Sequence, residues 1–576
     1  MSKSCEGFGV RKFLHMADIK CILEGSDSEN EAERDSVSNI VYIPPSPDAL
    51  SDTEHINDEI VDGSEVDALQ DVAGEIELHF INTKEDIAAP SLDLSKTEHN
   101  SPGKKPGFSK TSIPRSVWKK TKFPKFPPIA HNTTGLEAQQ EDLVNIYGGK
   151  TPIELFKLFF DKEVVELIIT ESKKYASQNN VTTNILDERL LNRFIGFLLF
   201  SGYHKLPEIE HYWRQQNDFG IPIVKEALTR NEFRQVKRFL HIADNNSLDS
   251  NDRFAKVTPL IALLNKKFMQ FGVFHEYLSI DEQMVPYFGR HSSKMYIRNK
   301  PIKFGFKLWV LASSDGYMYS TIPYAGSTQP YDKEIGLGAH VVLKLLENVE
   351  HPEWHCKNFL ACGTVRRNRL PSNLSLKGKK ELKKGESDYA FDKQNGIYVI
   401  SWQDNSLVTI ATNFESMEPM NSARRYNRTL QKYVNLPQPH AIANYNLHMG
   451  GVDMADNAIS NYRISIRGKK WWWPLFSNAV DSCLVNAWKL HCFISKAQKN
   501  KQMSQLDFRS VVSTALLSFN YTEEQNIEQD NIAETQRPDG LPRATTVVAT
   551  SAAVAATMLK STTGRIQISR HTSARY

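Results

Sequence analysis

Residues 277–284 read Tyr-Leu-Ser-Ile-Asp-Glu-Gln-Met, so an acidic pair falls at the end of a short apolar run. The run predicts a strand from Tyr277 to Ile280. Two further β-like stretches, Phe304 to Ala312 and Tyr317 to Pro323, are joined by Ser-Ser-Asp-Gly, which favours a hairpin turn. An acid at a strand end before a hairpin is a candidate metal ligand, although such acids are also common on ordinary surfaces. Whether Asp281 is a metal ligand or an ordinary surface carboxylate therefore has to be judged from the rest of the chain.

Helical signals flank this β-like region on both sides. Thr151-Pro152-Ile153-Glu154 and Thr229-Arg230-Asn231-Glu232 are capping boxes that predict helix starts. With the Leu- and Phe-rich periodicity between them, they predict a helical domain over 146–276. Downstream we expect a helix from Ile335 to Val349, a β-rich stretch over 389–411, and helices again from His440 to Lys496. The order is helical, mixed, β-rich and helical, which predicts an α/β protein.

Charge divides the chain into an acidic front and a basic body. Residues 1–100 carry 7 Lys or Arg against 23 Asp or Glu, a net of −16, whereas the remaining residues carry a net of +19. The acidic front is Ser-rich and poor in apolar periodicity, so we expect residues 22–100 to be disordered. Residues 104–125 hold eight Lys or Arg and no acid, which favours nucleic-acid contact, a nuclear import signal or a linker. A basic body is typical of proteins that bind polyanions, but it also occurs as a merely solvated surface.

Several protein classes are excluded at this point. No apolar run approaches the roughly 18 to 20 residues of a membrane span, and the N-terminus has no apolar core of a secretion signal. We therefore expect no membrane association and no secretion. The six cysteines are scattered without a closely spaced pair, which indicates neither a disulfide framework nor a Cys-rich zinc module.

Five strings of sequence together resemble the piggyBac transposase family, including its domesticated animal descendants, over roughly residues 146 to 500. They are long, ordered, and rich in Gly and Trp, so chance agreement is improbable. The strings are SIDEQMVPYFGR (279–290), IRNKPIKFGFKLW (297–309), GTVRRNR (363–369), YNLHMGGVDMAD (445–456) and RISIRGKKWWWPLF (463–476).

The resemblance implies cut-and-paste transposition of double-stranded DNA, by a homodimer in the nucleus, with three catalytic aspartates and two Mg²⁺ ions. Asp281 matches the family's first catalytic Asp, Asp453 matches the last, and Asp456 matches an accompanying acid. Two divalent ions would activate the attacking oxygen and steady the leaving one, and hard oxygen ligands suit them. Asp453 and Asp456 are spaced i, i+3, which places both on one helix face.

The implied fold is an RNase H-like catalytic core, interrupted by a β-rich insertion domain and flanked by a helical dimerisation and DNA-binding domain. The corresponding divisions are 1–130 (disordered and acidic, with a basic segment at 104–126), 146–276 (helical), 277–372 (core, first part), 373–435 (insertion), 436–457 (core, last part), 458–500 (helical, second part) and 501–576 (low-complexity tail).

This sequence departs from the family at the second catalytic aspartate. In the family that residue lies on a strand after the helix, and a further helix precedes the Gly-Thr-Val-Arg strand. Here Gly363 follows Val349 too closely for a strand and a helix, and no Asp occurs between Asp332 and Asp388. Glu350 and Glu353 are weak substitutes beside Pro352, and His351, His355 and Cys356 lack further partners for zinc. We therefore expect an incomplete Mg²⁺ site and impaired catalysis.

DNA contact is the other expectation. Beside the tryptophans at 471–473, the basic residues Arg463, Arg467, Lys469 and Lys470 suit phosphate contact with aromatic packing. The alternative is that these tryptophans are core and only the basic residues are exposed. Residues 500–576 contain no cysteine, so the family's C-terminal zinc module is absent from this sequence.

Three functions remain open at this stage. The first is a transposase-derived nuclear DNA-binding protein without competent transposition. The second is an active transposase whose missing segment is an error of the gene model. The third is a chromatin-associated interaction protein that uses its acidic front.

Overall fold

The computed structural model of the 576-residue chain describes residues 10–13, 37–43, 75–80, 116–126, 133–181, 186–216, 218–297, 300–326, 331, 335–347, 349, 360–428, 430–519 and 546–549. The chain divides into two compact units, which are described separately. Residues 1–114 and 286–305 form one unit, and residues 115–285 and 306–576 form the other.

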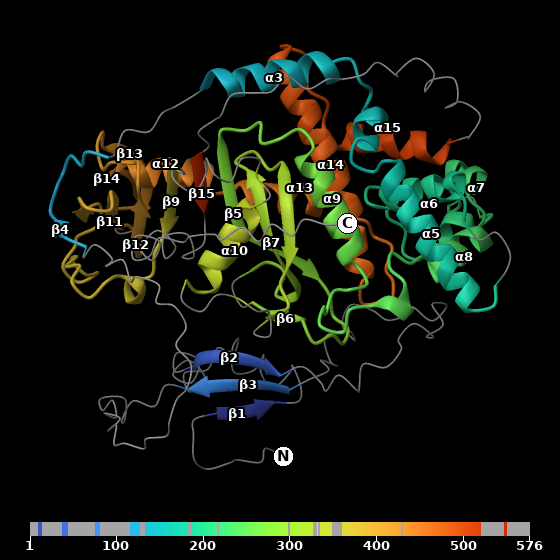
Figure 1. Cartoon of the computed structure of the whole chain (residues 1–576), viewed down its shortest axis with the longest axis horizontal. Coiled ribbons are helices and arrows are strands. Elements are labelled where there is room, and N and C mark those ends of the chain that lie inside the picture. Colours follow the sequence, from blue (N-terminus) through green and yellow to red (C-terminus); the bar gives the residue numbers. More distant parts are fainter. Residues whose placement is uncertain are drawn as a thin grey trace, which may run out of the picture. The chain divides into compact units, whose positions relative to one another are not determined.

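The first unit contains three strands, two of which lie within residues 22–100, for which the composition predicts disorder. Strands β1 (Val10–Phe13), β2 (Val37–Ile43) and β3 (Glu75–Phe80) form an antiparallel sheet in the order β1-β3-β2 (Figure 1). The prediction of a wholly disordered acidic front is therefore wrong for these stretches. Their apolar and β-branched residues supply strand propensity that the average composition conceals. The same unit holds β6 (Met295–Tyr296), which pairs with the first residues of β7.

The second unit begins its helical part before the predicted start near Tyr147, and both capping boxes are confirmed. In α4 and α8, the Thr151 and Thr229 side chains accept from the N3 backbone, and Glu154 and Glu232 reach back to the cap. The helices are α3 (Thr133–Tyr147), α4 (Pro152–Lys157), α5 (Lys162–Gln178), α6 (Glu188–Ser201), α7 (Pro222–Ala227), α8 (Arg230–Phe239), α9 (Thr258–Met269), α14 (Trp473–Ala497) and α15 (Gln505–Leu517), with short 3-10 turns at Ile209–Trp213 and Asn245–Ser247.

Helix α15 corrects the prediction that everything after residue 500 is a low-complexity tail. Ser504 caps its N-terminus, and Phe508, Val512 and Leu516 are buried. Gly196 of α6 lies so close to α15 that an added Cβ would be 2.8 Å from Leu516 Cβ. The helical part therefore extends to Leu517.

A mixed sheet lies beside these helices. Its strands are β5 (Tyr277–Pro286), β7 (Phe304–Ser313), β8 (Met318–Pro323) and β9 (Leu360–Thr364), and α10 (Leu337–Leu346) follows β8 in the chain. Strands β7 and β8 form the predicted antiparallel hairpin, and Gly316 has φ +97° in its turn. The short strand β15 (Thr546–Ala549) runs parallel to β5 on one side and to β9 on the other. The strand order β9-β15-β5-β7 places β15 at the centre of this part of the sheet.

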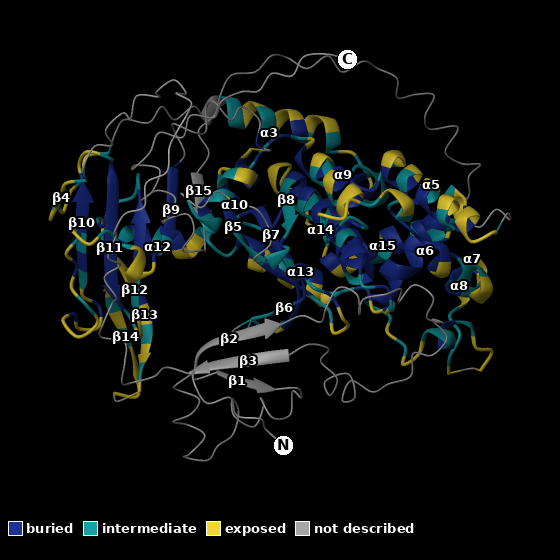
Figure 2. Cartoon of the chain, turned by 60° about the horizontal axis from the view of Figure 1, so that its bottom comes forward, coloured by how far each residue is buried: buried dark blue, intermediate teal, exposed yellow. Residues whose placement is uncertain are grey.

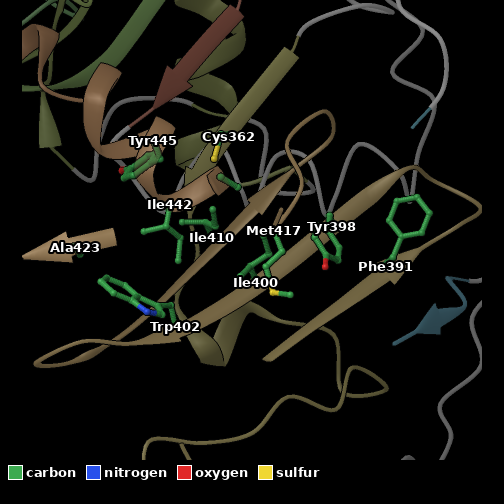
Figure 3. Close-up of a cluster of buried hydrophobic side chains, with 11 residues drawn as sticks. Cys362, Phe391, Tyr398, Ile400, Trp402, Ile410, Met417, Ala423, Ile442 and Tyr445 are labelled. Atoms are coloured by element: carbon green, nitrogen blue, oxygen red, sulfur yellow. The ribbon is translucent and has the colours of Figure 1, made fainter. Parts of the chain in front are cut away.

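The β-rich stretch after β9 forms a separate hydrophobic core. Strands β10 (Ser387–Asp392), β11 (Ile397–Gln403) and β12 (Leu407–Thr412) extend the sheet antiparallel, after a short 3-10 turn at Arg367–Arg369. Strands β13 (Asn421–Asn427) and β14 (Lys432–Gln438) form a two-stranded sheet of their own, and α12 (His440–His448) and α13 (Gly451–Asn461) follow. Trp402, Tyr398 and Tyr445 are among the buried side chains between these elements (Figure 3).

Part of the predicted basic segment is folded onto this core. Strand β4 (Trp118–Lys119) pairs with β10, and Phe126 lies edge-on to Phe391 at 5.7 Å between ring centroids. Lys120 Nζ lies 2.7 Å from Asp388. Residues 116–126 are thus folded against the β-rich core, with an edge strand at Trp118–Lys119, rather than part of a disordered region.

Candidate active site and nucleic-acid interface

Strand β5 carries Asp281 towards the helices that follow the β-rich core. Ser279 Oγ donates to the Met449 carbonyl at 2.7 Å, just before α13, and Gln283 Nε2 donates to Asp456 Oδ1 at 3.4 Å, within α13. Alternate residues of a strand share a face, so Asp281 lies on this same face between its two neighbours. The sequence-predicted Asp281 therefore lies beside the first turns of α13.

Helix α13 approaches the sheet closely because its first residue is glycine. A Cβ added to Gly451 would lie 2.1 Å from the Ser313 carbonyl oxygen of β7 and 3.0 Å from Ser279 Cβ. Asp453 is in the first turn of this helix and is exposed. A carboxylate there is favoured by the positive end of the helix macrodipole. The structure thus places Asp281 and Asp453 on adjacent elements, β5 and α13.

Asp456 is held by protein groups on two sides. Besides the Gln283 amide, Arg463 Nη2 lies 3.6 Å from Asp456 Oδ1. Gln283 is buried, and its Oε1 accepts from Asn478 Nδ2 of α14 at 3.2 Å. Asn478 and Gln283 therefore link α14, β5 and α13, a role that the sequence analysis missed because nothing local marks these two amides.

Within the described residues, no group of three or more His, Cys, Asp or Glu side chains lies close enough together to hold a metal ion. Residues 350–359, which include the candidate substitutes Glu350 and Glu353 and the residues His351, His355 and Cys356, lie outside the described part of the chain.

Tyr445 connects Asp281 with the strand on the far side of β15. It is buried, hydrogen-bonded to Thr364 of β9, and close enough to Asp281 to be influenced by its charge. Burial raises the pKa of the Tyr445 hydroxyl, and the nearby Asp281 charge adds to this effect. The phenol therefore remains protonated at neutral pH beside the carboxylate.

The four predicted DNA-contacting residues separate into two groups. Lys470 is buried, and its Nζ donates to the carbonyls of Lys237, Arg238 and Leu240 at 3.3, 2.8 and 3.2 Å. Its ammonium therefore caps the C-terminus of α8, and Lys470 is withdrawn from the DNA-contacting set. Arg467 is exposed, whereas Arg463 and Lys469 are half-buried.

The neighbouring tryptophans are mainly core, which was the alternative interpretation. Trp472 and Trp473 are buried, and Trp473 Nε1 donates to the Ile466 carbonyl at 2.8 Å. A Cβ at Gly468 would lie 2.5 Å from the Trp473 ring, so the basic loop lies flat against it.

A buried ion pair fixes the start of this loop. Arg509 Nη2 of α15 lies 2.8 Å from Asp481 Oδ1 of α14, and both side chains are fully buried. Asp481 Oδ2 accepts from the Ile464 backbone N–H at 3.1 Å, and Arg509 Nε donates to the Leu199 carbonyl at 2.8 Å. Nothing local in the sequence pairs these two residues, although a charged residue in the apolar pattern of each helix is a visible signal.

Comparison with known proteins identifies relatives of this chain. The family model described as Transposase IS4 matches residues 151–356 and 352–488. The human PiggyBac transposable element-derived protein 3 is 37% identical over 418 aligned residues, which cover 68% of this chain and 68% of that protein. The human PiggyBac transposable element-derived protein 2 is 32% identical over 432 residues, with 71% of each chain covered.

A solved structure shares the fold. The cryo-EM structure of a piggyBac transposase synaptic complex with hairpin DNA superposes with a TM-score of 0.53 at 20% identity, and the match covers 68% of this chain and 87% of that chain. None of the helices that the structure describes is long and apolar enough to cross a membrane.

The family match is divided into two parts that overlap at residues 352–356. This division falls within the interval between Val349 and Gly363, where the sequence lacks room for a strand and a helix. The alignment with the first human relative spans 418 positions, more than 68% of a 576-residue chain supplies. The relative therefore contributes residues for which this chain has no counterpart.

Proposed function

Because this chain belongs to the piggyBac transposase family, we propose that it is a nuclear, homodimeric protein that binds double-stranded DNA and has impaired cut-and-paste transposition. The observation that carries the proposal is the division of the family match into two parts that overlap at residues 352–356. That interval is where the family resemblance places the second catalytic aspartate. DNA binding is supported by the net charge of +19 over residues 101–576.

Asp281 and Asp453 are the residues that would hold a divalent cation, because carboxylate oxygens suit Mg²⁺. A bound ion would neutralise charge on the phosphodiester and lower the pKa of an attacking water or hydroxyl. Ser279 and Gln283 fix the strand on each side of Asp281, and the close approach of Gly451 fixes the helix that carries Asp453. We assign Asp456 a positioning role, since Gln283 and Arg463 already engage its carboxylate.

Two measurements on the full chain test the proposal. Binding to duplex DNA should weaken linearly in log affinity with log salt concentration, and supercoiled DNA with Mg²⁺ should remain uncut. A salt-independent or undetectable interaction would contradict the DNA-binding claim. Efficient Mg²⁺-dependent nicking by the unmodified chain would contradict the impairment.

A graft tests the cause of the impairment. A segment of the family type, with the strand aspartate that the resemblance implies, is inserted between Val349 and Gly363 of this chain, and nicking is measured with Mg²⁺. We expect the graft to restore nicking, whereas the same graft with its aspartate changed to asparagine should not. Equal, absent nicking by the graft and the parent would refute our account of the defect.

The second candidate is an active transposase whose missing segment was lost from the gene model. The family match resumes directly at residue 352 and continues to 488, which favours a discrete omission over gradual decay. Sequencing genomic DNA and transcripts across codons 349–363 decides between the two. An in-frame segment encoding a strand aspartate would favour the active enzyme.

A further inference from the structure

Strands β13 and β14 form a two-stranded ribbon with two different faces (Figure 2). On β13, Ala423 is buried and Arg425 half-buried, whereas the alternate residues Arg424 and Tyr426 are exposed. On β14, half-buried Val434 and Leu436 alternate with exposed residues. One face therefore belongs to the protein, and the other faces solvent.

The inner face anchors the ribbon to the β-rich core. Trp402 Nε1 donates to the Pro437 carbonyl at 2.8 Å, and Ala423 lies in the same buried cluster as Trp402 (Figure 3). Arg425 Nε lies 3.1 Å from Asp404 Oδ2, so this guanidinium is neutralised by the protein itself. The ribbon is thus held at its base and along one face.

The outer face presents an ordered group of aromatic and cationic side chains. Tyr426 and Tyr433 are cross-strand partners with ring centroids 5.4 Å apart, and they remain 50% and 59% exposed. The Arg424 guanidinium stacks on the Tyr433 ring at 4.1 Å. Leu430, in the turn, is also exposed. Large side chains exposed together on a structured surface are typical of an interaction site.

The charge of the ribbon indicates which partner it fits. Residues 421–438 contain Arg424, Arg425, Arg428 and Lys432 and no acidic residue. Among the described residues, the ion pair found in this set is that of Arg425 with Asp404, whereas Arg424 on β13 and Arg428 in the following turn are exposed. This surface carries exposed guanidinium groups beside aromatic rings. It therefore suits a polyanion better than it suits a protein surface with few acidic residues.

We propose that the outer face of the β13–β14 ribbon is a contact surface for duplex DNA, with Arg424 and Arg428 on phosphates and Tyr426 and Tyr433 supporting them. The major groove, about 12 Å wide, admits a two-stranded ribbon, and the flanking backbone lies within reach of the arginines. This proposal rests on the proposed DNA-binding function. It adds a DNA-contacting surface outside the basic loop predicted at 463–470.

Two adjacent arginines provide a matched test. Arg424→Gln removes a charge from the outer face, and Arg425→Gln removes one that Asp404 already neutralises. Affinity of the full chain for a 30-base-pair duplex is measured by fluorescence anisotropy over a range of salt concentrations. One lost phosphate contact should reduce the slope of log affinity against log salt by about 0.9, and the double variant Arg424→Gln/Arg428→Gln should reduce it by roughly twice as much.

We expect these losses with unchanged circular dichroism, and an unchanged slope for Arg425→Gln. If the unmodified chain binds with a salt dependence that Arg424→Gln/Arg428→Gln leaves intact, the ribbon proposal is overturned and a protein partner becomes the occupant to seek. If Arg425→Gln reduces the slope as much as Arg424→Gln, the face assignment is overturned. If the unmodified chain does not bind DNA, both this proposal and the proposed function fail.

Discussion

Lys470 and Arg467 lie three residues apart in one basic loop, yet the structure predicts opposite consequences for their loss. Lys470→Met keeps the length and apolar stem of the side chain but removes the donors to three carbonyls at the end of α8. Each buried hydrogen bond to a charged group contributes about 1.5–3 kcal/mol, and relief from burying the ammonium offsets part of the loss. We therefore expect the free energy of unfolding to fall by about 2–4 kcal/mol.

Arg467→Met should behave in the reverse way. Arg467 is exposed, and exposed ion pairs contribute at most about 1 kcal/mol, so stability should change little. If Arg467 contacts a phosphate, the salt slope of DNA binding should fall by about 0.9. Urea unfolding and anisotropy titrations at several salt concentrations measure the two quantities on both variants. A stable Lys470→Met protein with a reduced salt slope would refute the assignment of Lys470 to the α8 cap.

Three further perturbations have outcomes that the structure specifies. Burial alone would raise the pKa of Asp388, but hydrogen bonds from Lys120 and the Lys377 backbone N–H outweigh it and hold the pKa below its ordinary value. Asp388→Asn should therefore speed tryptic cleavage near Lys120. In the unmodified chain, the contact between Lys120 and Asp388 should persist at neutral pH and weaken only as the pH falls below about 4. Equal cleavage rates for the variant and the unmodified chain would count against the packing of this strand on β10. Arg509→Met leaves Asp481 charged or protonated in a buried site and should lower the unfolding free energy by about 3–5 kcal/mol, most of which Arg509→Met/Asp481→Leu should recover in urea titrations. Gly451→Ala should lower the free energy of unfolding by about 1–3 kcal/mol, because its Cβ meets the Ser313 carbonyl. Gly450→Ala has open space around its Cβ and should be nearly neutral. Similar thermal midpoints for the two variants would show that α13 does not pack as described.

Local signals predicted the elements well. The capping boxes at Thr151 and Thr229 begin helices at the next residue. Asn395-Gly396 and Asp404-Asn405 are sequences that favour turns, and they separate β10, β11 and β12 within the predicted β-rich stretch. These signals act over three or four residues, so the sequence contains them in readable form. The apolar pattern after Thr151 predicts one amphipathic helix from Ile153 to Tyr175, but this stretch is split between α4 and α5.

Long-range partners account for what the sequence did not reveal. Lys470 appears as one cation in a basic run, and only the arrival of α8 carbonyls from much earlier in the chain makes it a buried cap. For the segment that contains Lys119 and Lys120, the sequence left nucleic-acid contact, nuclear import or a linker open, whereas in the structure Lys120 pairs with Asp388 and Lys119 lies in a strand beside β10. For the candidate site, the family resemblance points to Asp281 and Asp453. Gln283 and Asn478 have no local signature, because the role of a side-chain amide depends on hydrogen-bond partners that are distant in sequence.

Strand β15 lies between β5 and β9, and its contribution to the stability of the sheet can be tested. Loss of a strand between β5 and β9 would leave backbone donors and acceptors of both strands unpaired, and buried unpaired groups are costly. Residues 546–549 pair in parallel with residues 277–280 of β5 and 360–363 of β9, and so occupy that position. Replacing residues 546–549 by Ser-Gly-Ser-Gly, at constant chain length, should lower the thermal midpoint, because each net backbone hydrogen bond contributes about 1 kcal/mol and Gly weakens a strand. The graft that restores the segment after Val349 should make the same replacement harmless, since the strand position would then be filled from within the core. An unchanged midpoint in the ungrafted chain would mean that the C-terminal strand does not support the sheet.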